Sequence, residues 1–323
     1  MQRQVSLFTP EVDWTPPSSL PELSGYNEVA IDLETYDPLL MSHGPSWAFP
    51  DAGYITGIGI ATKDFSLYFP IQHEGGGNLD KGLVLRWLTK QMTYKNDKIF
   101  HNSLYDVGWL KRYGIKVHGK IQDTMFAAPL IDENQYSYSL NNLGEKYCGE
   151  TKDETLLIEA AEAYGLNPKS EMYKLPAKYV GPYGEQDAEL TLKLWQGFKE
   201  LIKLENVGKI YELETSLIPI LLDMRYKGVP VDLDVAEQVS KKLKTEENQI
   251  LNAINKEFGM KPDLWAAQSV ATVFDRAGLS YPRTPKTNAP SFSGDWLESH
   301  DHKLANNIVR ARKLNKARTT FID

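Results

Sequence analysis

The segment VAIDLE at residues 29–34 decides the fold prediction. Its apolar residues and period-2 pattern predict a β-strand, in which residues i and i+2 project from the same face. Asp32 and Glu34 would then stand side by side on an otherwise apolar strand. Neighbouring carboxylates repel each other, and a divalent cation such as Mg²⁺, which prefers oxygen ligands, relieves that repulsion. An edge strand with one face in water also explains the pattern, and the D-x-E spacing taken alone favours that interpretation.

The segments around this strand indicate an α/β domain with a mixed sheet. Four of them have clear patterns: strands at 54–62 and 65–71, a helix at 79–93 and a strand at 98–101. A helix is expected from about Ser103, and the chain turns helical from about residue 123. Pro182 and Tyr183 mark the expected start of a long helix, because proline is favoured in a first turn. Three early strands followed by alternating helices and strands predict a sheet flanked by helices.

A third acidic residue lies in HNSLYDVGWL at 101–110. Asp106 falls about one turn into the predicted helix, among apolar residues, where an acidic side chain needs a reason. A surface aspartate that favours the positive end of the helix dipole is an equally good explanation.

A fourth acidic residue lies in YGEQDAELTL at 183–192. Tyr183 and Asp187 are four residues apart and share one face of the predicted helix. Asp187 can complete a metal site, and Tyr183 can hold a water molecule beside it. An amphipathic helix whose polar face happens to carry these residues is the simpler alternative.

The 323 residues predict two domains after a short arm. Residues 1–25 contain prolines that break helices and are expected to form the arm. Residues 26–204 form the α/β domain, and residues 205–323 form a helical domain. Long helical patterns are found at 206–226 and 235–257, and shorter helices are expected near 266–277 and 302–318.

The composition, with 41% hydrophobic and 24% charged residues, is that of a globular protein. The net charge of −7 argues against a simple basic DNA-binding module. The single cysteine, Cys148, excludes an internal disulfide and a cysteine-based zinc site. No apolar run suits a membrane span or a signal peptide, so we expect a cytoplasmic protein without a membrane partner.

Taken in order, the three motifs resemble the DEDD exonuclease superfamily in its tyrosine-bearing branch. The resemblance covers about residues 27–200 and implies a ribonuclease-H-like sheet with four acids clustered at one edge. It assigns catalysis to Asp32, Glu34, Asp106, Tyr183 and Asp187, and metal binding to the four acids among them. The implied cofactors are two divalent ions, Mg²⁺ or Mn²⁺.

The helical part extends this resemblance to the family A DNA polymerases, and phage-type versions come closest. ELETSLIPILLDMRYKGVPVD at 212–232 resembles the start of their polymerase region, and the segments at 266–279, 283–298 and 309–323 resemble the rest of a thumb. These 323 residues contain no palm or fingers motif, so this chain alone is not expected to polymerise nucleotides. A separate palm and fingers chain is a possible partner.

The resemblance implies a proofreading 3′→5′ exonuclease of phage-type DNA replication, placed in the bacterial host cytoplasm. It would remove nucleoside 5′-monophosphates from single-stranded or frayed DNA 3′ ends by two-metal hydrolysis. Tyr183 would orient the attacking water, since its phenol is a poor base at neutral pH. Asp32 is expected to bridge the two ions.

Substrate contacts are expected from two regions of the chain. In the first, the backbone near Leu33 and Thr35, with Asn102 and Tyr105, would hold the terminal bases. In the second, a basic stripe that includes Arg310, Arg312 and Lys313 would contact phosphates, although a solvated helix face explains the same pattern. Asp123, before an apolar helix, is expected to be an N-cap rather than a catalytic residue.

Two other functions remain open. One is an RNA-directed exonuclease of the same superfamily, against which the thumb-like half argues. The other is a non-catalytic DNA-clamping or partner-binding piece of a split polymerase, against which the intact set of acids argues.

Overall fold

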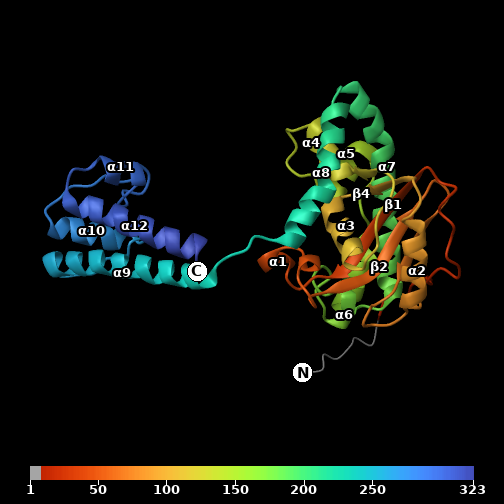
Figure 1. Cartoon of the computed structure of the whole chain (residues 1–323), viewed down its shortest axis with the longest axis horizontal. Helices are drawn as coiled ribbons and strands as arrows, with labels where there is room; N and C mark the ends of the chain where they lie inside the picture. Colours follow the sequence, from red (N-terminus) through yellow and green to blue (C-terminus); the bar gives the residue numbers. More distant parts are fainter. Residues whose placement is uncertain (1–8) are drawn as a thin grey trace. The chain divides into compact units, whose positions relative to one another are not determined.

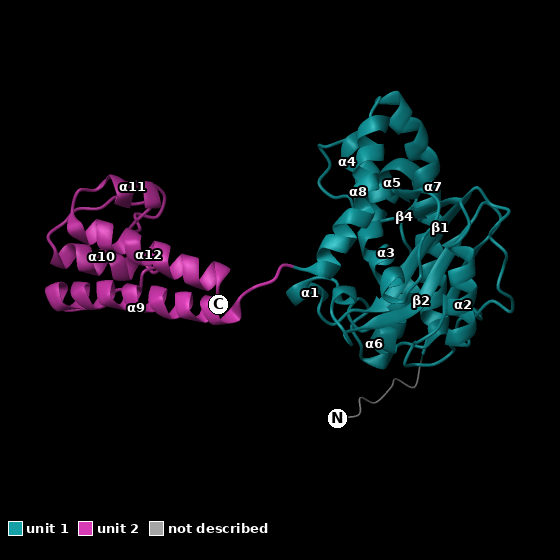
Figure 2. Ribbon diagram, in the orientation of Figure 1, with its two compact units in different colours: residues 1–228 teal, residues 229–323 magenta. Residues whose placement is uncertain are grey.

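The computed structural model describes residues 9–323, which form two compact units (Figures 1 and 2). The first, which we call the α/β unit, ends at Gly228, and the second, the helical unit, spans Val229–Asp323. The first eight residues of the predicted arm lie outside the described part of the chain. Within residues 9–323, no helix has the length and apolar character needed to cross a membrane.

The α/β unit is built on a five-stranded sheet with β1 (Glu28–Tyr36) at its centre. The strand order is β3-β2-β1-β4-β5, and the outer strands are β2 (Tyr54–Ala61), β3 (Ser66–Pro70), β4 (Asp97–Phe100) and β5 (Ile121–Asp123). β1 pairs antiparallel with β2 and parallel with β4. The predicted mixed sheet is therefore confirmed, with the short β5 as an addition.

Helices cover both faces of this sheet (Figure 1). Those of the α/β unit are α1 (Leu40–His43), η1 (Ser46–Ala48), α2 (Lys81–Gln91), α3 (Ser103–Arg112), α4 (Thr124–Ile131), α5 (Leu140–Cys148), α6 (Thr155–Tyr164), η2 (Met172–Lys174), α7 (Ala177–Leu204) and α8 (Gly208–Lys227). The longest of them, α7, packs along β1, β2 and β3.

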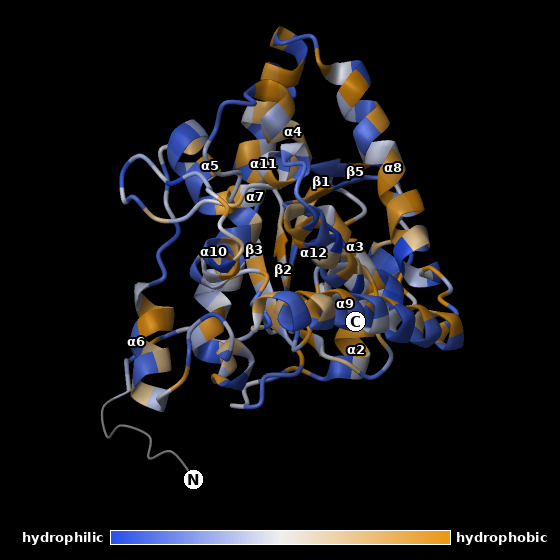
Figure 3. Cartoon of the chain, turned by 90° about the vertical axis from the view of Figure 1, so that its left-hand side faces the viewer, coloured by the Kyte–Doolittle hydropathy of each residue, from blue (hydrophilic) through white to orange (hydrophobic). Residues whose placement is uncertain are grey.

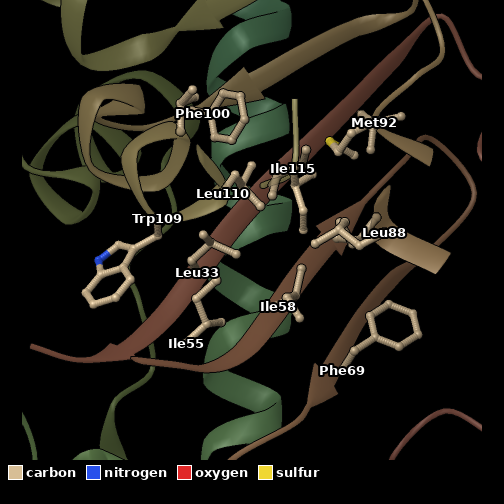
Figure 4. Packing of buried hydrophobic residues seen from close by; sticks show 14 of the residues in the cluster. Leu33, Ile55, Ile58, Phe69, Leu88, Met92, Phe100, Trp109, Leu110 and Ile115 are labelled. Atoms are coloured by element: carbon tan, nitrogen blue, oxygen red, sulfur yellow. The ribbon is translucent and has the colours of Figure 1, made fainter. Parts of the chain in front are cut away.

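Alternation along β1 separates the two faces of the sheet. Ile31 and Leu33 belong to a large apolar cluster with residues of α2 and α3. Figure 4 shows Leu33, Ile58 and Phe69 on three neighbouring strands within this cluster. Ala30, in contrast, belongs to the cluster that contains residues of α7. Asp32 and Glu34 therefore project from the face that α7 covers.

Two glycines allow α7 to approach the sheet closely. A Cβ atom on Gly59 of β2 would lie 2.5 Å from the carbonyl oxygen of Gly184 in α7. A Cβ atom on Gly184 would in turn collide with the ring of Tyr68. Any larger side chain at these positions would push the helix away from the sheet.

The start of α7 corrects the sequence prediction. The helix begins at Ala177 rather than near Pro182, with Pro176 at its N-cap. Pro182 lies inside the helix, where it removes one backbone hydrogen bond. The prediction was wrong because the helix already begins directly after Pro176, six residues before Pro182.

The described part of the arm, residues 9–25, packs on the α/β unit. The indole of Trp14 donates a hydrogen bond to Glu185 Oε1 at 3.0 Å, and that of Trp87 donates to the carbonyl of Pro21 at 2.7 Å. Leu23 is fully buried. The arm thus contributes to the core of this unit.

Helix α8 belongs to the α/β unit, so this unit extends beyond the predicted boundary at residue 204. The hydroxyl of Tyr226 donates to the carbonyl of Gly108 at 2.8 Å, and the hydroxyl of Tyr211 accepts from the Asp123 backbone N–H at 2.8 Å. Ile218 is fully buried in the cluster with residues of α3. Long-range packing of this kind cannot be read from the composition change near residue 205.

The helical unit consists of α9 (Leu233–Phe258), α10 (Ala267–Arg276), α11 (Gly294–Ser299) and α12 (Lys303–Phe321). Three of the four were predicted, and the short α11 was missed. Phe274 is fully buried at the centre of an aromatic group with Phe292 and Trp296, at ring distances of 4.9 and 5.8 Å. Figure 3 shows both hydrophilic and hydrophobic residues on α9, which contributes Leu251 and Ile254 to the buried cluster of this unit.

Candidate active site

Three acidic side chains from two distant parts of the sequence meet between β1 and α7. Ligand oxygens of Asp32, Glu34 and Asp187 all lie within 4.8 Å of one another. The strand supplies two of them through its i, i+2 spacing, and the helix supplies the third because the glycine contact brings it close to the sheet. Such a cluster of oxygen ligands is compatible with a divalent metal ion.

Burial and mutual repulsion make these carboxylates difficult to ionise. Burial raises the pKa of Asp32 to about 7, and the charge of Asp187 adds to the rise. Burial, followed by the charges of Asp32 and Asp187, raises the pKa of Glu34 well above its usual value. A bound cation would offset this repulsion, so the electrostatics fit a metal site.

The carboxylate of Asp187 is bonded on one side only. Its Oδ2 lies 2.6 Å from Nζ of Lys152, whereas its buried Oδ1 has no hydrogen-bond partner within residues 9–323. A buried oxygen normally has a partner, so an unsatisfied one needs an explanation. The chemistry of the neighbouring acids indicates that a cation is the missing partner of Oδ1.

Tyr183 lies one turn before Asp187 on α7, as the sequence predicted. Its hydroxyl accepts a hydrogen bond of 2.8 Å from the Lys152 ammonium. Burial, followed by the charge of Asp187, raises the pKa of Tyr183 above its usual value. The phenol therefore stays protonated and can donate a hydrogen bond but cannot act as a base.

Asp106 is buried beside this group but is held by the backbone. Its Oδ1 accepts a hydrogen bond of 3.0 Å from the N–H of Leu33, in the middle of the D-x-E motif. Burial and the charge of Asp32 raise its pKa well above the usual value. Asp106 is not one of the three acids whose oxygens converge within 4.8 Å. Its assignment as a metal ligand stays a prediction.

The predicted substrate residues of the α/β unit lie on β1 and at the start of α3. Asn102 is exposed and adopts a left-handed backbone with φ 72° and ψ 55° at the start of α3. The hydroxyl of Tyr105 lies 2.6 Å from Thr35 Oγ1 and donates to Asp37 at 3.0 Å. Leu33 is buried, so only its backbone could contact a substrate.

The predicted basic stripe on α12 contains residues in different environments. The Arg312 guanidinium donates to the carbonyls of Leu264 and Phe292 at 2.8 Å each, which is a structural role. Arg310 is largely exposed, 3.4 Å from Glu246. Lys313 is also exposed and forms an ion pair of 2.7 Å with Glu298. DNA contact by all three residues stays a prediction.

Asp123 caps α4 through the N–H groups of Met125 and Phe126, which confirms the N-cap prediction.

Lys152 is a residue of the site that the sequence did not predict, because it lies in an irregular loop and no spacing rule connects it to Asp187. It lines a cavity of about 650 Å³ together with Asn141, Met172 and Tyr183.

The sheet and its acidic side chains together define a class of protein. A mixed sheet with two acids on its central strand and a third on the covering helix is the architecture of the ribonuclease-H-like nucleases. A family model described as 3′-5′ exonuclease matches residues 18–203. The chain belongs to this family, the 3′–5′ exonuclease domain of family A DNA polymerases.

Relatives of known sequence extend the match over both units. A DNA-directed DNA polymerase of Pseudomonas phage M6 is 37% identical over 98% of this chain and 49% of its own length. DNA polymerase DpoZ of Vibrio phage phiVC8 is 31% identical over 83% of this chain and 46% of its own length. DNA polymerase I of Rhizobium leguminosarum is 26% identical over 81% of this chain and 27% of its own length. The chain thus spans about half the length of the phage polymerases it matches.

A solved structure supports the fold. The structure described as the POL domain of Pol1 from M. smegmatis in complex with DNA primer-template and dNTP has a TM-score of 0.65. The similarity covers 90% of this chain and 45% of that one, at 17% sequence identity. Together with the mixed sheet, it confirms the predicted fold class.

Proposed function

We propose that this chain is a 3′→5′ exodeoxyribonuclease that removes nucleoside 5′-monophosphates from single-stranded or frayed DNA 3′ ends. The observation that carries the proposal is the convergence of Asp32, Glu34 and Asp187 within 4.8 Å, with one oxygen of Asp187 left without a partner. Membership of the exonuclease family of DNA polymerases favours DNA as the substrate and proofreading as the role.

The three converging acids would hold divalent metal ions, with Asp106 beside them. Mg²⁺ fits best because all the ligands are oxygens, and Mn²⁺ is the closest substitute. When bound, two such ions would supply the positive charge that activates water and stabilises the leaving oxygen.

The remaining groups would act on water and the DNA end. Tyr183, kept protonated by its raised pKa, would donate a hydrogen bond and so orient the attacking water. Water loses a proton and adds to the phosphorus of the last phosphodiester, and the P–O3′ bond breaks. The terminal nucleoside 5′-monophosphate is released, and O3′ of the shortened strand takes up a proton to become a 3′-hydroxyl. Asn102 and the backbone at Leu33 and Thr35 would position the terminal nucleotides.

The test is degradation of a 5′-labelled single-stranded DNA oligonucleotide with Mg²⁺ or Mn²⁺. We expect a ladder that shortens from the 3′ end and disappears with EDTA or in the Asp32→Ala/Glu34→Ala double variant. An RNA oligonucleotide of the same sequence separates this function from RNA trimming. A folded wild-type protein that leaves DNA intact under every metal would refute the proposal and favour a non-catalytic DNA clamp.

A second proposal concerns a partner and rests on α8. Its exposed apolar residues Leu213, Ile220 and Met224, with Leu217 between them, recur at helical spacing on one face. We propose that the remaining half of a family A polymerase, in the same polypeptide or a separate chain, covers this face.

Titration with the second half of the Pseudomonas phage relative tests the partner proposal. Binding should be lost when Ile220 and Met224 are changed to Ser. Binding that survives these changes would place the contact elsewhere, and no binding by the wild-type chain would refute the partner.

A further inference from the structure

Lys152 lies outside every sequence motif, yet it is in direct contact with two residues of the site. Its Nζ lies 2.6 Å from Asp187 Oδ2 and donates a hydrogen bond of 2.8 Å to the hydroxyl of Tyr183. The same ammonium lies 4.5 Å from the centre of the Tyr183 ring. The lysine side chain is only 11% exposed, so its charge is committed to the site rather than to solvent.

The loop that carries Lys152 is fixed on both sides of this residue. The backbone N–H of Lys152 donates to Asn141 Oδ1 at 2.9 Å, and that of Asp153 donates to Gln186 Oε1 at 2.8 Å. Glu150, on the other side, forms an ion pair of 2.8 Å with Lys193 of α7. The position of the ammonium group is therefore built into the fold.

The geometry restricts what each partner of the ammonium can do. An ammonium group only donates hydrogen bonds, so the Tyr183 oxygen must accept and its own hydrogen remains available for another acceptor. Oδ2 of Asp187 is occupied by Lys152, so the buried Oδ1 is the atom left for a cation. One side chain thus determines the roles of two others.

We propose that Lys152 is a positioning residue of the exonuclease site, which orients the Tyr183 hydroxyl and presents one chosen oxygen of Asp187 to the metal. The inference rests on the proposed exonuclease function. It has an unusual consequence, because the lysine charge also repels a divalent cation. Removal of Lys152 should therefore improve metal binding and impair turnover at the same time.

The test compares Lys152→Met with Lys193→Met in the full chain. Lys193 also ties the 149–154 loop to α7 through its pair with Glu150, but it does not contact the acidic group. Mn²⁺ affinity is measured by electron paramagnetic resonance, and kcat and KM are measured on a single-stranded DNA oligonucleotide. For Lys152→Met we expect roughly tenfold tighter Mn²⁺ binding and a kcat about 10- to 100-fold lower with KM little changed. Lys193→Met should change neither, because the exposed Lys193–Glu150 pair is weak and the backbone hydrogen bonds of Lys152 and Asp153 still hold the loop.

Tighter Mn²⁺ binding together with a lower kcat distinguishes a positioning role of Lys152 from a role in supporting the fold, which would weaken both. If Lys152→Met weakened Mn²⁺ binding together with turnover, or left turnover unchanged, the proposal would be overturned. Should that variant fail to fold, Lys152→Arg carries the test: its charge keeps Mn²⁺ affinity unchanged, while its larger planar group displaces Tyr183 and lowers kcat. Full turnover in the arginine variant would overturn the positioning role.

Failure of the proposed function would look different. A wild-type chain without nuclease activity on any substrate would refute the exonuclease, but the Mn²⁺ affinities would still be read. Tighter Mn²⁺ binding by Lys152→Met would then support control of Asp187 by the lysine, and an unchanged affinity would overturn it.

Discussion

The buried residues of the helical unit are all apolar, whereas the α/β unit also buries charged side chains, among the residues that the structure describes. Those charges fall into two kinds. Asp123 accepts hydrogen bonds from Ser103 and from the start of α4, and the Lys98 ammonium donates to three backbone carbonyls at 2.6–2.9 Å. Asp187 instead keeps one buried oxygen without a partner.

This difference teaches how a structural charge can be distinguished from a functional one. A buried charge that serves the fold is surrounded by its own donors or acceptors, because leaving it unpaired destabilises the protein. The acids at β1 and α7 are compensated only in part, by the ion pair of Asp187 with Lys152, and have raised pKa values. These acids lower the stability of the α/β unit, whereas the helical unit has no buried acid among its described residues.

The largest effect is expected from Glu34→Gln, which removes a charge from the acidic group while keeping its shape. Exonuclease turnover should fall roughly 10³-fold or more, since a metal ligand is lost. In EDTA at pH 8, the free energy of unfolding of the α/β unit should rise by about 1–2 kcal/mol, because a buried repulsion is relieved.

Turnover and chemical denaturation measure the two effects of Glu34→Gln. The exposed Glu189→Gln on α7 serves as the control and should leave both unchanged. A metal-free Glu34→Gln protein that is less stable than wild type would show that this carboxylate supports the fold after all.

In the helical unit, Phe274→Ala should have the largest effect on stability. Removing a fully buried ring from an aromatic group costs about 3–5 kcal/mol. Hydrogen exchange followed by mass spectrometry should show the loss in peptides of α10 and α12 and not in β1 or α7. Exonuclease activity on a short oligonucleotide should persist, and its loss would show that the acidic site in the α/β unit depends on the fold of the helical unit.

The pH dependence of stability should also separate the units. The folded pKa of Asp32 is raised to about 7, so the folded α/β unit retains a proton that the unfolded chain has already lost. In EDTA its stability should therefore fall as the pH rises from about 4 to 7, by up to about 1 kcal/mol per pH unit, and level off above pH 7.

Asp32→Asn should flatten this dependence, and saturating Mn²⁺ should suppress it. The helical unit, which has no buried acid among its described residues, should not follow the same profile. Denaturation at pH 5, 6, 7 and 8, read separately for each unit by hydrogen exchange, measures the effect. A stability of the α/β unit that rose from pH 6 to pH 8 would contradict the assigned cause.

The smallest effect is expected on the surface of α12. Changing Arg310 and Lys313 together to Ala should reduce the salt dependence of DNA binding by a slope of about 1–2, with stability altered by no more than about 0.5 kcal/mol. Arg312→Ala should instead destabilise the helical unit, since it leaves two backbone carbonyls without their partner. If the salt dependence of DNA affinity were unchanged in the double variant, Arg310 and Lys313 of α12 would not contact DNA.

The sequence predicted the parts of this molecule that depend on local periodicity. Strand alternation placed Asp32 and Glu34 on one face, and helical spacing placed Tyr183 and Asp187 together, as the structure has them. Both signals extend over only a few residues, and each follows directly from backbone geometry.

Other parts could not be predicted because they depend on distant contacts. Lys152 contacts Asp187 from an irregular loop. Helix α8 belongs to the α/β unit because it packs on α3 and α4. Arg312 donates hydrogen bonds to two backbone carbonyls of other segments instead of facing solvent. None of these leaves a periodic trace in the sequence. The start of α7 was also mispredicted, because the sequence offers two prolines in this region and the helix begins after the first of them.

Gly59 and Gly184 determine how near α7 lies to the sheet, and with it the space between Asp187 and the acids of β1. Mg²⁺ demands oxygen ligands at about 2.0–2.1 Å in a strict octahedron, whereas Ca²⁺ accepts about 2.3–2.6 Å and looser geometries. A wider helix-to-sheet separation would therefore favour the larger ion. If the site binds Mg²⁺ as proposed, its size discrimination would depend on two uncharged residues that bind no ion themselves, and Gly184→Ala should alter the ion preference without changing any ligand.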